Sequence, residues 1–71
     1  MKTLQEFNVV IEQDADGNFI ASVPELRGCH TQAKSLDALM KRIREVIELC
    51  LEDQEDGFVP STFVGVQRIR I

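Results

Sequence analysis

The sequence predicts an α+β domain of two layers, in which one helix packs on a largely antiparallel sheet in the order β-β-β-α-β. Two short apolar stretches flank an Asp-Gly turn near the N-terminus, which indicates a hairpin. A long segment after residue 35 repeats its apolar residues at spacings of three and four, as an amphipathic helix does. With 71 residues, the chain has room for one hydrophobic core, and we treat residues 1–71 as a single domain.

The hairpin is predicted from two strands and the turn between them. Residues 4–13 alternate apolar and polar side chains, which is typical of a half-buried strand. Gly17 permits the positive φ angle that a tight turn requires, so the chain should reverse there. Residues 18–23 then form the return strand, which Pro24 ends because proline has no backbone donor.

The second half of the predicted domain consists of a strand, a helix and a strand. Gly28 closes a loop before a short third strand at residues 29–33. Ser35 has the side chain of a helix N-cap, and the helix should fade near Gln54. Its apolar stripe consists of Leu36, Leu39, Met40, Ile43, Val46, Ile47, Cys50 and Leu51. A final strand is expected at residues 62–71, with a change of apolar phase that a bulge near Gly65 would reconcile.

The overall charge excludes some classes of function. Twelve acidic residues against eight basic ones give a net charge of −4, and Lys and Arg do not cluster, which argues against direct nucleic-acid binding. An acidic surface suits a basic protein partner. The sequence has neither a run of about 20 apolar residues nor a signal-peptide pattern, so we expect a cytoplasmic protein. Two cysteines are too few for a disulfide framework or a zinc site, which leaves core packing.

The sequence offers little for catalysis, and we expect no enzymatic activity, metal or cofactor. His30 is the only histidine and lacks the further ligands or bases that a metal or nucleophile site needs, which favours a structural role. Asp14 and Asp16 could be an acid–base or metal pair, but turn formation explains both. A nuclease that also used Glu12 is disfavoured because all three carboxylates come from one hairpin.

The order of these motifs resembles the HicB-like antitoxin family. The resemblance is carried by the Asp16-Gly17 turn, Phe19, Ala21, the Pro24-to-Gly28 loop of sequence Pro-Glu-Leu-Arg-Gly, the Ser35 cap and the Ile47-Glu48-Leu49 segment. It covers almost the whole chain and implies a degenerate ribonuclease-H-like fold without catalytic machinery. It also implies that the protein neutralises a small basic ribonuclease toxin of the HicA type by binding it. Many members carry a DNA-binding segment after this domain, whereas this chain stops at Ile71, so we expect no operator binding by it.

Two surface features are candidates for binding a protein. If residues 7, 9 and 11 face the helix, alternation places Val10 and Ile20 on the opposite, uncovered face of the sheet. Asp53 and Glu55, in an acidic run after the helix, would steer a basic partner at the rim. The contact would be with a toxin or with a second copy, since so small a domain gains stability by self-association. The alternative function is a small homo-oligomeric regulator or adaptor without a toxin partner.

Overall fold

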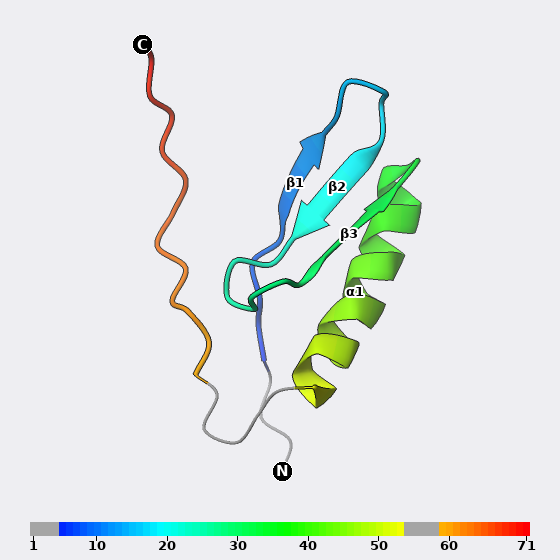
Figure 1. Cartoon of the computed structure of the whole chain (residues 1–71), viewed down its shortest axis with the longest axis vertical. Coiled ribbons are helices and arrows are strands. Elements are labelled where there is room, and N and C mark those ends of the chain that lie inside the picture. Colours follow the sequence, from blue (N-terminus) through cyan, green and yellow to red (C-terminus); the bar gives the residue numbers. More distant parts are fainter. Residues whose placement is uncertain (1–4, 54–58) are drawn as a thin grey trace.

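The computed structural model describes residues 5–53 and 59–71 (Figure 1). Its elements in chain order are β1 (Val10–Gln13), β2 (Phe19–Ser22), β3 (His30–Ala33) and α1 (Leu36–Glu52). The strands form an antiparallel sheet in the order β1-β2-β3, and α1 packs on one face of it. This confirms the predicted α+β class, with a β-β-β-α order among the described residues.

The turn between β1 and β2 is built by one carboxylate. Oδ1 of Asp14 accepts hydrogen bonds from the backbone N–H groups of Asp16, at 3.0 Å, and Asn18, at 2.9 Å. The bond from the Asn18 backbone is the largest of the causes that lower the pKa of Asp14. Gly17 has a φ of +87°, which an L side chain rarely adopts. The predicted turn is therefore confirmed, and the Asp14 carboxylate is engaged in it.

The core lies between β2, β3 and α1. Its fully buried apolar side chains come from β2, from the loop after it and from the helix: Ala21, Val23, Leu26, Cys29, Leu39 and Ile43. Ile47 and Cys50 pack on the same cluster, as the helical spacing predicted. Leu36 and Met40, also predicted on the buried stripe, are 48% and 47% exposed. The buried stripe is narrower than predicted because α1 contacts β2 and β3 but not β1.

The helix begins where the sequence indicated. Ser35 has an extended backbone, with a φ of −138°, and its hydroxyl accepts a hydrogen bond from the backbone N–H of Ala38 at 3.2 Å. Asp37 lies in the first turn, where a negative charge is favourable near the positive end of the helix dipole. The N-cap and the first turn thus fix the start of α1 directly after β3.

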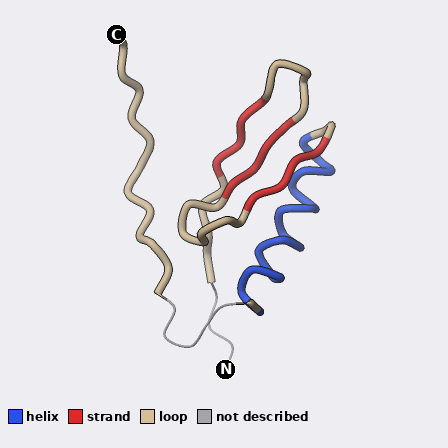
Figure 2. The backbone as a smooth tube through the Cα atoms, viewed as in Figure 1, coloured by secondary structure: helices blue, strands red, loops and turns tan. Residues whose placement is uncertain are grey.

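Two predicted strands differ from the structure. The first was expected over residues 4–13, but only its last four residues, Val10–Gln13, pair with β2, and residue 4 lies outside the described residues. The final strand, expected at residues 62–71, is wrong for the isolated chain: described residues 59–71 are drawn as an extended loop with no strand assignment (Figure 2). An alternating segment becomes a strand only when another strand supplies hydrogen bonds, and this segment lies apart from the sheet in Figure 1.

The buried stripe of α1 leads to a test of its contribution to stability. Replacing Ile43 by Ala should lower the free energy of unfolding by about 2–5 kcal/mol, because a side chain with 2% exposure leaves a cavity between helix and sheet. Urea unfolding followed by circular dichroism measures the loss. Leu49→Ala on the same helix is the matched control, since Leu49 is 60% exposed, and should change stability by only about 0.5 kcal/mol. Equal losses in the two variants would contradict the observed packing.

Candidate protein-interaction surface

The strand register divides the sheet into a covered face and an open face. Ala21, which is fully buried under α1, lies opposite Ile11 and Thr31, so these residues share the helix face. The alternate positions point the other way. They form two cross-strand rows, Val10–Ser22–His30 and Glu12–Ile20–Gln32. We call these six residues the open face.

The open face has an apolar centre and a polar border. Val10 and Ile20 are both half-buried and lie diagonally across β1 and β2. Exposed Glu12, His30 and Gln32 surround them. Among the described elements, α1 is the one that packs on the sheet, and it does so on the other side. The structure therefore places the two predicted docking residues, Val10 and Ile20, together on a face that the fold leaves uncovered.

The acidic residues predicted at the rim are not brought to this face. Asp53 is the C-cap of α1, where its backbone N–H donates to the Leu49 carbonyl at 3.2 Å, and it therefore lies on the helix side of the sheet. Glu55 falls outside the described residues. The acidic side chain that does border Val10 and Ile20 is Glu12. Sequence alternation alone could have identified it, because Glu12 is two residues from Val10 on the same strand and therefore points to the same face.

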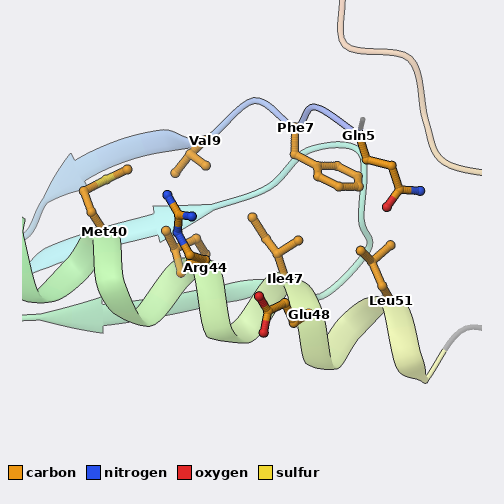
Figure 3. A pocket seen from close by; sticks show the side chains of 9 residues that line it. Gln5, Phe7, Val9, Met40, Arg44, Ile47, Glu48 and Leu51 are labelled. Carbon is orange, nitrogen blue, oxygen red and sulfur yellow. The ribbon is translucent and has the colours of Figure 1, made fainter. Parts of the chain in front are cut away.

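A second apolar surface, which sequence reasoning missed, lies on the helix side of the sheet beside β1. This groove has a volume of about 410 Å³. Its apolar lining consists of Phe7, Val9, Met40, Ile43, Ile47 and Leu51. Figure 3 shows Phe7 and Val9 on one wall and the helix side chains on the other, with Arg44 and Glu48 at the border. The predicted inward direction of residues 7, 9 and 11 is therefore correct, but Ile11 stays 44% exposed because no helix covers β1.

Glu25 links the loop after β2 to the segment before β1. Its Oε2 accepts hydrogen bonds from both the backbone N–H and the side-chain amide of Asn8, each at 2.9 Å. Its carbonyl accepts from the backbone N–H of Ser61 at 3.2 Å. Next to Glu25 in this loop, Leu26 fills the core and Gly28 adopts a φ of +76°. Within the Pro-Glu-Leu-Arg-Gly sequence, Glu25 therefore holds neighbouring segments by hydrogen bonds and Leu26 packs in the core.

The two side chains that could be nucleophiles or bases here, a cysteine and the histidine, lie in different environments. Burial raises the pKa of the Cys29 thiol to about 12, assisted by its contact with Cys50, so it is protonated at neutral pH and is a poor nucleophile. His30 is exposed on the open face, opposite Ser22. Within residues 5–53 and 59–71, no three side chains of the metal-binding types gather into a possible metal site.

The Glu25 carboxylate makes stability depend on acid pH. Desolvation at its 9% exposed position raises the pKa, but hydrogen bonds to the carboxylate, first those from the backbone and side chain of Asn8, together hold the pKa below its ordinary value of 4.5. A lowered folded-state pKa stabilises the fold fully above the unfolded-state value, and this contribution is lost as the pH falls through the lowered value. Glu25→Gln should therefore flatten the loss of stability between pH 5 and acid pH, as measured by urea unfolding at each pH. Parallel pH profiles for the two proteins would contradict this role.

The comparisons with known proteins agree with the motif order. A family model described as the HicB-like antitoxin of bacterial toxin–antitoxin systems matches residues 7–67. A UPF0150 protein of Synechocystis is 51% identical over 65 residues, which cover 92% of this chain and 93% of that protein. A UPF0150 protein of Archaeoglobus fulgidus is 52% identical, with 93% and 94% covered. A third UPF0150 protein, from Thermotoga maritima, is 32% identical, with 100% and 97% covered.

The matched region contains both candidate surfaces. Residues 7–67 include the whole sheet, the helix and the walls of the groove except Gln5. In the part of the chain that the structure describes, α1 is not long and apolar enough to cross a membrane. With a family match over most of its length and relatives of nearly equal length, the chain belongs to the HicB-like antitoxin family of bacterial toxin–antitoxin systems.

Proposed function

We propose that this protein is the antitoxin of a HicA-type pair and neutralises a small basic ribonuclease by covering its active surface with the open face. Membership of an antitoxin family implies a protein toxin as partner and suggests a role in binding rather than catalysis. The observation that carries the choice of surface is that Val10 and Ile20 are diagonal neighbours on the uncovered side of the sheet. Apolar side chains within a polar border are typical of protein interfaces.

Charge supports a basic partner. The chain carries a net charge of −4, which attracts a cationic protein over distances of the order of the Debye length. Glu12 brings negative charge onto the open face itself, beside Ile20. Of the predicted rim residues, Asp53 contributes in this proposal to long-range steering from the end of α1, whereas Glu55 lies outside the described residues. Association should therefore slow as salt concentration rises, whereas dissociation should respond less.

Substitutions on the open face test this surface. Val10→Asp combined with Ile20→Asp should abolish binding of the basic protein encoded by the neighbouring reading frame, because two charges would be buried at the interface without partners. Co-expression measures rescue of growth from the toxin, and calorimetry with purified proteins measures affinity. Leu36→Asp combined with Leu49→Asp is the matched control, with the same change of charge at exposed positions of α1.

Each possible result has a clear meaning, provided that circular dichroism shows both double variants to be folded. Loss of binding and rescue in the open-face variant alone supports the proposal. Wild-type binding by that variant would move the toxin contact elsewhere. If the wild-type protein binds no product of the neighbouring gene and rescues no toxin, the alternative of a homo-oligomeric regulator without a toxin replaces the proposal.

The isolated chain should not bind its own promoter specifically. Its acidic charge and scattered basic residues provide no surface that would release counterions from a phosphate backbone. A mobility-shift assay at moderate salt should show no specific complex below roughly micromolar protein. The same assay with added toxin is the companion measurement, because a complex could supply the missing basic surface. A tight, sequence-specific shift by the chain alone would contradict this part of the proposal.

A further inference from the structure

The C-terminal segment is extended, apolar and without a partner strand in the isolated chain. We call residues 62–71 the arm. Phe63 is half-buried, but four other large apolar side chains of the arm are largely in solvent: Val64 is 94% exposed, Val66 80%, Ile69 78% and Ile71 116%. The radius of gyration is 13.7 Å, above the roughly 11 Å of a compact domain of this length, in keeping with a segment that stands away from the rest. Such an arm exposes both its side chains and its backbone groups to water.

The sheet has a free edge beside an apolar groove. β1 pairs with β2 on one side and, among the described residues, with no strand on the other. The groove described above lies on the helix side next to this edge, between Phe7 and Val9 on one wall and Ile47 and Leu51 on the other (Figure 3). A sheet edge with unpaired N–H and C=O groups is a template for an added strand.

We propose that two copies of this chain exchange their arms, each arm adding as a fourth strand to the free edge of β1 in the other copy. The proposal does not depend on the toxin. Reciprocal exchange uses the same two surfaces in both copies, so it closes at a dimer and leaves no unpaired arm. It also supplies the apolar burial that so small a core lacks by itself.

The side-chain phases of the arm fit this position. In a strand, Ile69 and Ile71 share one face, which matches the apolar groove. Val64, Val66, Arg68 and Arg70 share the other face and would extend the open face, where Glu12 of β1 offers a negative charge. Both faces of the arm then contact an apolar surface, one the groove and the other the open face. The change of apolar phase within the arm therefore needs no bulge at Gly65.

The geometry favours a second copy over closure on the same chain. The residues that lead into the arm, 60–63, already lie along residues 5–8 of the same chain, and the Ser61 N–H donates to the Glu25 carbonyl. From that anchored base the rest of the arm stands apart from its own sheet (Figure 1), and among the described residues it pairs with no strand. Pro60 lies two residues before the arm and restricts the backbone there. An arm held in this way is available to the edge of another molecule.

Sedimentation of the full chain over a range of concentrations provides the first test. The wild type should be a dimer. Ile69→Asp combined with Ile71→Asp should raise the dimer dissociation constant by at least roughly a hundredfold, because both copies lose two buried apolar side chains. These positions are exposed in the single chain, so circular dichroism should still show a folded protein. Leu36→Asp combined with Leu49→Asp should leave the dimer intact. A monomeric wild type, or dissociation caused only by Val10→Asp with Ile20→Asp, would overturn the proposal.

Cross-linking separates exchange from closure on the same chain. One chain carries Ile11→Cys at the β1 edge and a second carries Ile69→Cys in the arm, both with Cys50→Ser to limit background labelling. After the two chains are mixed, unfolded and refolded together, a short bismaleimide should yield a covalent dimer of one chain with the other. If the cross-link instead forms only within a monomer that carries both substitutions, the arm closes on its own sheet and the proposed exchange is wrong.

Discussion

The width of a single helix determines which surfaces of this protein are covered. A helix with its side chains is about 10 Å across, whereas neighbouring strands lie about 4.8 Å apart, so one helix covers about two strands. Here α1 packs on β3 and β2, and Ala21 of β2 is fully buried beneath it. The third strand, β1, receives no helical cover. Both the apolar groove beside β1 and the exposure of Ile11 follow from that limit.

The loop between β2 and β3 compensates for part of this missing cover. Leu26 is 1% exposed and belongs to the core cluster that also includes Ala21 of β2 and Leu39 and Ile43 of α1. Glu25, its neighbour, holds Asn8 and thereby keeps the chain before β1 close to the sheet. The other carboxylate oxygen of Glu25 is buried without a hydrogen-bond partner among the described atoms. In this loop, Leu26 therefore packs in the core, whereas Glu25 positions the segment before β1.

Local chemistry explains which elements could be predicted from the sequence. The hairpin turn and the helix start were predictable because Asp14, Gly17 and Ser35 act on backbone groups within four residues of themselves. Val10 and Ile20 could be placed on one face because strand alternation has a period of two. The groove could not be predicted, since it depends on where α1 crosses the sheet. The prediction of a final strand was wrong for a similar reason: alternation shows that a segment can pair but does not identify its partner strand.

The alternation of β1 also separates the two proposed interactions. Val10 and Glu12 point to the open face, whereas Ile11 points to the helix side of the sheet and Val9, just before β1, lines the groove. One short segment therefore contributes to both surfaces with different side chains. A strand added at the edge of β1 uses backbone groups and leaves Val10 and Ile20 uncovered. It would place Val64 and Val66 beside them on the same face. In this arrangement, arm exchange enlarges the surface proposed for the toxin instead of competing with it, and charge on the open face can change toxin binding without changing the dimer.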